Sequence, residues 1–381
     1  MDFAWTEEQL RRHSAIIEFA RAELNDGLID RDRACEFNHA GWKRCAEMGI
    51  QGLPVPVELG GQGLDALGTV GALEALGYAC KDNGLVFAIN AHMWTAIMPM
   101  LAFGSDEQKH KYLPGLCNGE LIGGTAMTEP EAGSDAYSMK TTARRDGDNY
   151  IINGKKVMCT NGTIADVLVV FASVDPENVK AGVTAFLVEK DAPGFMPLRN
   201  VEKMGLRTAP LAELEFRDCT VPASQRLGNE GAGKNVFTEA MTWERGCILA
   251  FGVGAMQRLL EVSTRRARTR HQFGKPIGKL QLVASKIVDM KVRLETARAL
   301  LYRQAWLKST GKSPYLEAAL AKLHISECWV RCAEDAVQIH GGYGYMTEHE
   351  IERELRDAIA SRIYSGTSEI QRVISAQMIG L

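Results

Sequence analysis

The feature of this sequence that most constrains its fold is a change of residue pattern along the chain. Residues 1–120 carry apolar positions at helical spacing, with helix-capping signals at Thr6 and Ser105. Residues 121–228 consist of short β-rich runs separated by turn dipeptides. Long helical patterns return in residues 229–381. Strands that follow one another without intervening helices predict an antiparallel sheet or small barrel rather than a doubly wound sheet.

We therefore expect an α+β protein with an N-terminal α-helical domain, a central antiparallel β domain and a C-terminal helical bundle, because 381 residues are long for a single core. The expected domains are residues 1–120, 121–228 and 229–381. Strands are predicted at 141–145, 150–152, 156–160, 167–172, 184–188 and 213–216, the first three joined by turns at Asp146-Gly147 and Asn153-Gly154. Helices are predicted at 235–268, 281–310 and 314–339.

The composition excludes several classes of protein. Lys and Arg number 44 against 47 Asp and Glu, which argues against a protein that mainly neutralises nucleic-acid phosphates. No apolar run reaches the roughly 18 residues of a membrane span, and the N-terminus lacks the pattern of a secretory signal. Nine cysteines without CxxC pairs are typical of a reduced chain. We expect cytoplasmic localisation, no membrane association and no nucleic-acid partner.

No metal site is predicted. The eight histidines never adopt HxxxH spacing, and Cys328 and Cys332 lie one helical turn apart in an alanine-rich pattern typical of buried thiols. Residues 228–235 have the spacing of a phosphate-binding loop, but Asn235 stands where a hydroxyl would have to hold magnesium. Both observations favour structural interpretations.

Four separated segments carry the strongest functional signal. They are residues 125–135 (TAMTEPEAGSD), 268–275 (RTRHQFGK), 338–345 (QIHGGYGY) and 364–371 (YSGTSEIQ). In order and spacing they resemble the acyl-CoA dehydrogenase family over the whole chain. The resemblance implies a C-terminal four-helix bundle and an FAD cofactor held between the β domain and the bundle. It also implies a homo-oligomer, expected to be a tetramer, in which a neighbouring subunit completes the FAD site.

The same resemblance implies cofactor-binding roles for particular residues. Met127 and Thr128 would contact the isoalloxazine ring, Thr160 would lie beside the flavin, and Ser134 would lie near the cofactor or the carrier arm of the substrate. Residues of the later segments would reach the pyrophosphate and adenosine or close the pocket around them: Arg270, Gln272, Phe273, Gln338, Gly341, Gly342, Thr367 and Glu369. Glycine at two of these positions would let the backbone approach the cofactor closely.

The chain departs from the family pattern at one decisive position. Most members carry a catalytic Glu where this sequence has Ser365, and a serine hydroxyl alone cannot take a proton from carbon at neutral pH. A minority branch that includes isovaleryl-CoA dehydrogenase places the base at the position of Glu244. Glu244 is therefore the predicted base, with Trp243 and Arg245 beside the substrate. The alternative is an exposed Glu244 paired with Arg245 or a nearby lysine.

The chemistry implied is α,β-dehydrogenation of an acyl thioester. Glu244 would remove the α-proton, the main-chain N–H of Ser365 would donate to the thioester oxygen, and the β-hydride would pass to the flavin. The exchange of Glu for Ser at position 365 would leave room for a branched or cyclic acyl group.

The sequence most resembles the branch that oxidises acyl groups on carrier proteins in natural-product pathways, including prolyl-carrier dehydrogenases. An acyl or peptidyl carrier protein is the expected partner, and arginines at 265–270 would either dock it or serve the FAD phosphates. A short- or branched-chain acyl-CoA dehydrogenase is one alternative. A flavin oxidase or monooxygenase on the same fold is another. The electron acceptor would be an electron-transfer flavoprotein or oxygen.

Overall fold

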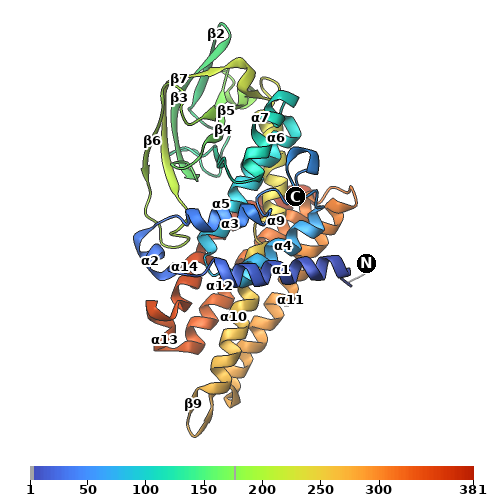
Figure 1. The fold of residues 1–381 in the computed structure, drawn as a ribbon, viewed down its shortest axis with the longest axis vertical. Coiled ribbons are helices and arrows are strands. Elements are labelled where there is room, and N and C mark those ends of the chain that lie inside the picture. The colour runs from blue at the N-terminus through green and yellow to red at the C-terminus, as the bar shows by residue number, and fades with distance from the viewer. Residues whose placement is uncertain (1–3, 176) are drawn as a thin grey trace.

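The computed structural model describes residues 4–175 and 177–381, so the first three residues of the expected N-terminal domain lie outside it. The N-terminal region is helical (Figure 1). Its elements are α1 (Glu7–Glu23), α2 (Leu28–Ala34), α3 (His39–Glu47), η1 (Val57–Leu59), α4 (Ala66–Ala79), α5 (Asn83–His92), η2 (Met93–Ile97), α6 (Met98–Phe103) and α7 (Asp106–Cys117). Both predicted helix starts are confirmed, because Thr6 and Ser105 each form a complete capping box.

The central region forms one sheet at the upper end of the molecule (Figure 1). Its strands are β1 (Gly123–Ala126), β2 (Thr142–Asp146), β3 (Asn149–Thr160), β4 (Val167–Ser173), β5 (Val183–Glu189), β6 (Phe195–Asn200), β7 (Leu211–Pro222) and β8 (Arg226–Leu227), with the short α8 (Val179–Gly182) and η3 (Ala223–Gln225) between them. The main path runs β6-β7-β3-β2-β4-β5-β8. Most pairs are antiparallel as predicted, although β4 pairs in parallel with β1 and, through Thr142 and Ser173, with β2.

The predicted turn at Asp146-Gly147 is confirmed, but the one at Asn153-Gly154 is wrong. Strand β3 continues through this dipeptide, and the register with β7 shifts between Ile152 and Gly154. The Asn153 side chain accepts a hydrogen bond from the Asp218 N–H (2.8 Å). Pairing with β7 therefore turns a dipeptide typical of hairpins into a bulge.

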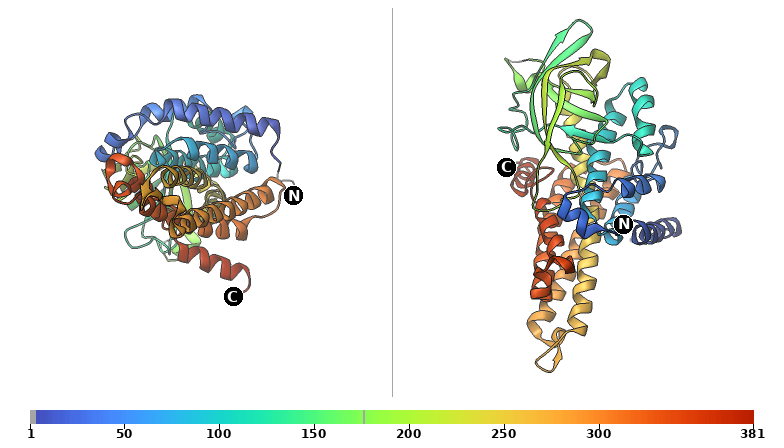
Figure 2. Two further views of the ribbon diagram at one scale, coloured as in Figure 1. Left: turned by 90° about the horizontal axis from the view of Figure 1, so that it is seen from below. Right: turned by 60° about the vertical axis from the view of Figure 1, so that its left-hand side comes forward.

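The C-terminal region is helical again, and its long helices run side by side below the sheet (Figure 2). The elements are α9 (Gly233–Cys247), α10 (Ala250–Thr269), β9 (His271–Gln272), β10 (Lys275–Pro276), η4 (Ile277–Lys279), α11 (Gln281–Ser309), α12 (Tyr315–His340), α13 (Gly342–Tyr345), η5 (Thr347–His349), α14 (Ile351–Ala360) and α15 (Ser368–Met378). The order of helices, sheet and helices confirms the expected fold class.

The single helix predicted over 235–268 is wrong, because the chain forms α9 and α10 with a break at residues 248–249. The Gln304 side-chain amide, from α11, donates to the Gly246 carbonyl (2.6 Å). In an uninterrupted helix this carbonyl would accept from the N–H of Ala250. A tertiary contact at Gly246, two residues beyond Glu244, therefore accompanies the break at residues 248–249.

The N-terminal and C-terminal helices pack closely where α4 crosses α10. A Cβ atom on Gly254 would lie 2.1 Å from the Glu74 carbonyl oxygen, and one on Gly77 would lie 2.2 Å from the Phe251 carbonyl oxygen. Glycine is therefore required at this crossing. The two regions share one hydrophobic core rather than resting on separate cores.

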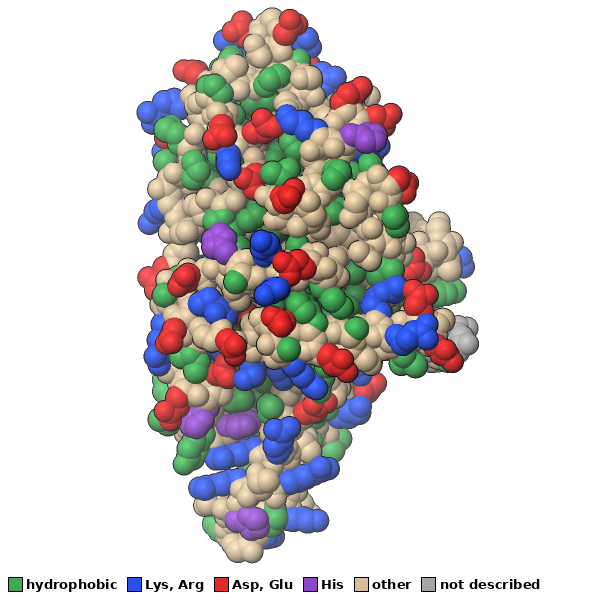
Figure 3. Space-filling model, in the orientation of Figure 1, with side chains coloured by type: hydrophobic (Ala, Val, Ile, Leu, Met, Phe, Trp, Pro, Cys, Tyr) green, Lys and Arg blue, Asp and Glu red, His purple; other side chains and the backbone are tan. Residues whose placement is uncertain are grey.

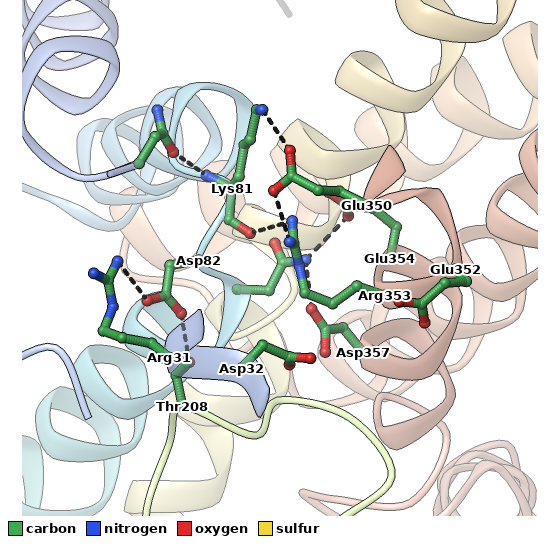
Figure 4. Close-up of polar contacts among 12 residues, drawn as sticks. Arg31, Asp32, Lys81, Asp82, Thr208, Glu350, Glu352, Arg353, Glu354 and Asp357 are labelled. Carbon is green, nitrogen blue, oxygen red and sulfur yellow. Dashed lines mark hydrogen bonds and ion pairs between the residues drawn. The ribbon is translucent and has the colours of Figure 1, made fainter. Parts of the chain in front are cut away.

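A buried ionic cluster joins all three regions of the chain (Figure 4). Asn83 of α5 donates to both Glu354 and Asp357 of α14, each at 3.0 Å. Asp357 also accepts from the Leu206 N–H, at 2.6 Å, in the loop before β7. Arg258 of α10 pairs with Glu354 at 2.7 Å. These contacts tie the loop of the β region to both helical regions.

Two helical stretches, Asn83–Phe103 and Gly233–Thr269, are long and apolar enough to cross a membrane by length and composition. Their most apolar windows are 89% and 83% buried inside the protein. Burial of this kind is typical of core helices in a folded domain.

Candidate active site

Glu244 lies on the inward face of α9, where Ala240, Met241 and Cys247 are also buried at helical spacing. Its side chain is only 7% exposed, and within residues 4–175 and 177–381 it forms no ion pair. One carboxylate oxygen, Oε1, accepts a hydrogen bond of 2.6 Å from the Ser365 hydroxyl. The other, Oε2, is buried without a hydrogen-bond partner among the described residues. The exposed, ion-paired alternative for Glu244 is therefore wrong.

The electrostatic environment of Glu244 has opposing parts. Burial raises the pKa of its carboxyl, while the Ser365 hydroxyl, Arg245 and Lys322 act to lower it. A carboxylate that is buried but partly compensated is more basic than one in water and is still ionisable. These are properties of a general base.

Ser365 lies in the turn between α14 and α15 with a φ of 56°, a left-handed conformation. The Gln371 side-chain amide donates to the carbonyls of Ser365 and Gly366, both at 3.0 Å. In the described part of the chain, the Ser365 N–H has no hydrogen-bond acceptor. This N–H is the donor predicted for the thioester oxygen, and the fold leaves it free.

Trp243, the residue before Glu244 on α9, packs against another tryptophan. The Trp243 ring stacks on Trp94 of η2, with centroids 5.7 Å apart and planes 5° from parallel. The Lys308 ammonium lies 4.0 Å from the centroid of the Trp243 ring. Arg245 Nε and the Tyr364 hydroxyl are buried without hydrogen-bond partners among the described residues. Unsatisfied buried polar atoms on the residues that adjoin Glu244 and Ser365 are typical of a site that takes a polar ligand.

The residues predicted to contact the flavin ring come from two neighbouring segments of the sheet. Met127 and Thr128 follow β1, and the Thr128 carbonyl accepts from the Val157 N–H of β3 (2.9 Å). Thr160 is the last residue of β3. The buried Lys156 ammonium donates to the Met127 carbonyl (2.9 Å), which aligns the segment after β1. Ser134 is exposed in the loop that follows.

The residues predicted to contact pyrophosphate and adenosine do not join this group within one chain. Arg270, Gln272 and Phe273 lie on the tip beyond α10, and Phe273 is 89% exposed. The rise of 1.5 Å per residue puts this tip roughly 40 Å from Glu244 along the helices. Lys and Arg side chains gather there (Figure 3).

Gln338, at the end of α12, and the adjoining Gly341 and Gly342 are also exposed. A Cβ atom added at either glycine would meet nothing within 4 Å. Thr367 caps α15 by accepting a hydrogen bond from the Ile370 N–H (3.2 Å), and Glu369 is exposed in the first turn of that helix. Of this later group, Thr367 and Glu369 lie near the Ser365 turn.

Sequence reasoning missed three residues of the site: Trp94, Lys322 and Gln371. Lys322 is fully buried on α12 among apolar neighbours such as Ala318 and Ile325. A lysine on the buried face of an apolar helical pattern is a detectable signal, because such a charge needs a reason. Trp94 and Gln371 carried no comparable signal.

A cavity of about 290 Å³ between α1, α4 and α11 contains none of the predicted site residues. Within residues 4–175 and 177–381, no group of three or more His, Cys, Asp or Glu side chains is arranged to hold a metal ion.

Three family models cover nearly the whole chain. The N-terminal, middle and C-terminal domains of acyl-CoA dehydrogenase match residues 6–120, 124–219 and 231–380. The chain therefore belongs to the acyl-CoA dehydrogenase family.

More specific similarity points to one branch of this family. The L-prolyl-[peptidyl-carrier protein] dehydrogenase of Pseudomonas fluorescens is 43% identical over 382 residues, covering 100% of both chains. The crystal structure of the prolyl acyl carrier protein oxidase AnaB has 54% identity and a TM-score of 0.98, covering 99% of this chain and 100% of AnaB. The structure of PigA with FAD and proline has 41% identity and a TM-score of 0.97, covering 100% of both chains.

Proposed function

We propose that this protein is an FAD-dependent dehydrogenase of a carrier-bound prolyl thioester, with Glu244 as the base. The observation that carries the proposal is the geometry of Glu244: a buried carboxylate with one oxygen held by Ser365 and the other oxygen free. Relatives at 41–54% identity that are named or titled for prolyl groups on carrier proteins support the substrate class.

The residues of the chain fit FAD. Buried polar atoms of Arg245 and Tyr364, the residues that adjoin Glu244 and Ser365, have no partner in the described part of the chain, and the glycines after α12 have open space where a side chain would be. Met127, Thr128 and Thr160 would hold the ring system, and a related structure contains FAD. When bound, FAD supplies the acceptor for the substrate hydride.

Residues of the protein remove the α-proton and stabilise the thioester oxygen. Glu244 Oε2 takes the α-proton of the thioester, which is acidic only if its oxygen is stabilised at the same time. The free N–H of Ser365 donates to that oxygen as negative charge develops. Trp243 and Trp94 bound the space for the acyl group, and Arg245 lies next to the base with an unused Nε–H.

The protein functions as a homo-oligomer, a tetramer or a dimer. Arg270, Gln272 and Phe273 lie too far from Glu244 to contact the same cofactor within one chain, so a second copy would bring them to it. The arginines at 265–270 then serve the FAD phosphates, and their distance from Glu244 makes them a poor docking site for the carrier within one subunit. The protein acts in the cytoplasm, and its electron acceptor is an electron-transfer flavoprotein or oxygen.

Two alternatives have support. Short-chain acyl-CoA dehydrogenase of mouse is 39% identical over 359 residues, which supports a CoA thioester as the alternative substrate. AnaB is titled an oxidase, which favours oxygen over a flavoprotein as the acceptor.

Anaerobic bleaching of the flavin tests the proposal. The protein should be mixed in parallel with prolyl-carrier, short branched acyl-carrier and the matching CoA thioesters. We expect rapid bleaching with the prolyl-carrier thioester. Bleaching by CoA thioesters alone would refute the carrier assignment. Reoxidation by air, compared with reoxidation by an electron-transfer flavoprotein, separates the two acceptors.

Glu244→Gln tests the base. The variant should bind FAD normally and lose about 10²–10⁴-fold in the rate of flavin reduction, the range of general-base catalysis. Glu334→Gln, a half-buried glutamate on α12 that pairs with Arg331, is the control and should reduce at the wild-type rate. An active Glu244→Gln variant would remove Glu244 from the mechanism.

A further inference from the structure

The contact between Ser365 and Glu244 has a direction. The hydroxyl donates to Oε1 at 2.6 Å, a short distance that is typical of an O–H group bonded to a charged oxygen. Because a serine hydroxyl has one proton, it can satisfy one carboxylate oxygen only. The bond therefore orients the carboxylate and leaves Oε2 as the atom available to a substrate.

The backbone around Ser365 is held in place independently of this bond. Gln371 binds the carbonyls of Ser365 and Gly366. The Lys322 ammonium donates to the same Gly366 carbonyl (2.7 Å). A left-handed φ at Ser365 costs energy for a non-glycine residue and persists only where its surroundings determine it. Two side chains from different helices provide those constraints.

Lys322 also interacts electrostatically with Glu244. Its side chain is completely buried, and no carboxylate lies within ion-pair distance of it among the residues described. Its charge acts on Glu244 through space, and the Tyr364 ring lies 5.8 Å from its ammonium. A buried cation without a paired anion is costly, and a nearby buried carboxylate is what offsets that cost.

We propose that Ser365 and Lys322 are positioning residues for the base: the Ser365 hydroxyl aims Glu244 and favours its ionised form, and Lys322 holds the turn that presents this hydroxyl. The inference rests on the proposed role of Glu244. It assigns to the Ser365 side chain a function separate from that of its main-chain N–H.

The groups that face Glu244 come from three elements. They are Arg245 on its own helix α9, Lys322 on α12, and Tyr364 with Ser365 in the turn before α15. Burial raises the pKa of Tyr364 well above its ordinary value, so this group stays neutral at physiological pH. Arg245 and the hydroxyl favour the carboxylate, and Lys322 does so while it is protonated, because burial lowers the pKa of Lys322 to about 7. Loss of the hydroxyl should therefore move the acidic limb of the rate profile to higher pH.

The test uses the FAD-loaded enzyme and single-turnover flavin reduction by the prolyl-carrier thioester between pH 5 and 9. Ser365→Ala and Ser365→Gly both remove the hydroxyl and keep the main-chain N–H, but only glycine relieves the left-handed strain. We expect both variants to reduce the flavin about tenfold more slowly on the acidic limb, since a hydrogen bond to a charged group changes an equilibrium by roughly this factor. Their rates should approach wild type at high pH.

Lys322→Met should move the acidic limb in the same direction. Ser326→Ala, on the same helix as Lys322, is the matched control, because its hydroxyl is buried but bonds only to its own helix at the Leu323 carbonyl. Infrared titration of the Glu244 carboxyl, taken as the difference from Glu244→Gln, gives a readout without turnover. The carboxyl should be protonated at a higher pH in both Ser365 variants.

Two failures are distinguishable. If Glu244→Gln reduces the flavin normally, the proposed base is wrong and this inference falls with it. If Glu244→Gln is inactive while both Ser365 variants keep the wild-type pH profile and carboxyl titration, Glu244 remains the base and the positioning role is wrong. A shift shared equally by Ser326→Ala would also overturn the proposal, because it would show a general effect of hydroxyl loss.

Discussion

Replacement of Lys156 by methionine tests how the segment after β1 is held. Lys156 is fully buried in β3, and its ammonium donates to the Met127 carbonyl and to Glu129 Oε1, both at 2.9 Å. Glu129 also accepts from the main-chain N–H groups of Lys140 (2.6 Å) and Thr141 (3.0 Å). Burial alone would raise the pKa of Glu129, but Lys156 and these donors hold it below its ordinary value.

The expected loss follows from what Lys156→Met leaves behind. Breaking a buried ion pair by removing one partner costs about 3–5 kcal/mol, because the other charge stays buried and uncompensated. Two N–H donors to Glu129 remain, so we expect a loss of about 3 kcal/mol. For a chain of 381 residues this is a fall in melting temperature of roughly 4 °C. The loss should shrink as pH falls through the raised pKa of the unpaired Glu129 carboxyl, because the carboxyl then takes up a proton. Binding of FAD should also weaken, because the Met127 carbonyl is no longer held.

Thermal melting of the FAD-loaded variants, with flavin absorbance as a measure of occupancy, checks this expectation. Lys190→Met is the matched control: Lys190 pairs with Asp166 at the same 2.9 Å, but its side chain is 58% exposed. That variant should lose at most about 1 kcal/mol. The double variant Lys156→Met with Glu129→Gln should recover most of the loss. Equal melting of the two single methionine variants would refute the reasoning.

Two further predictions concern the packing that supports the site. Gly254→Ala should lower the melting temperature, because the methyl group of alanine would lie 2.1 Å from the Glu74 carbonyl oxygen. This clash should outweigh the helix preference of alanine over glycine, which is about 1 kcal/mol. A more stable variant would contradict the close crossing of α4 and α10. Burial raises the pKa of Asp357 from 3.8 to about 6, so the native state binds the proton of this carboxyl more tightly than the unfolded state does. The proton's contribution to stability is therefore full below about pH 3.8 and is lost as pH rises through 6. Asp357→Asn should remove that part of the pH dependence of melting, and identical profiles for the two proteins would contradict this assignment.

Local signals predicted much of the fold. Capping boxes at Thr6 and Ser105, the Asp146-Gly147 turn and the end of α12 at Gly341 depend on residues a few positions apart. These interactions form within one element, so the sequence contains all of their partners. The same holds for the burial of Glu244, whose helical spacing from Met241 and Cys247 places it on the inward face of α9.

The two wrong predictions, the uninterrupted helix over 235–268 and the turn at Asn153-Gly154, fail because they depend on residues far apart in the sequence. The break between α9 and α10 coincides with a hydrogen bond from Gln304, which is 58 residues away from Gly246. The Asn153-Gly154 bulge depends on pairing with β7, where Asp218 bonds to the Asn153 side chain 65 residues earlier. In both places a distant partner overrides a correct local preference. Lys322 differs from these two cases: its place on the buried face of an apolar helix was detectable in the sequence, but the Gly366 carbonyl that it binds belongs to another helix connection.

The contact between positions 244 and 365 explains the departure of this chain from the common family pattern. Ser365 Oγ lies 2.6 Å from Glu244 Oε1, so a glutamate at position 365 would bring a second carboxylate into the same buried space. Two buried carboxylates at such a distance cannot both be ionised, and one of them would retain its proton. Only one position can supply an ionised base. Once Glu244 supplies it, position 365 needs a side chain that donates a hydrogen bond, and serine does so without adding charge.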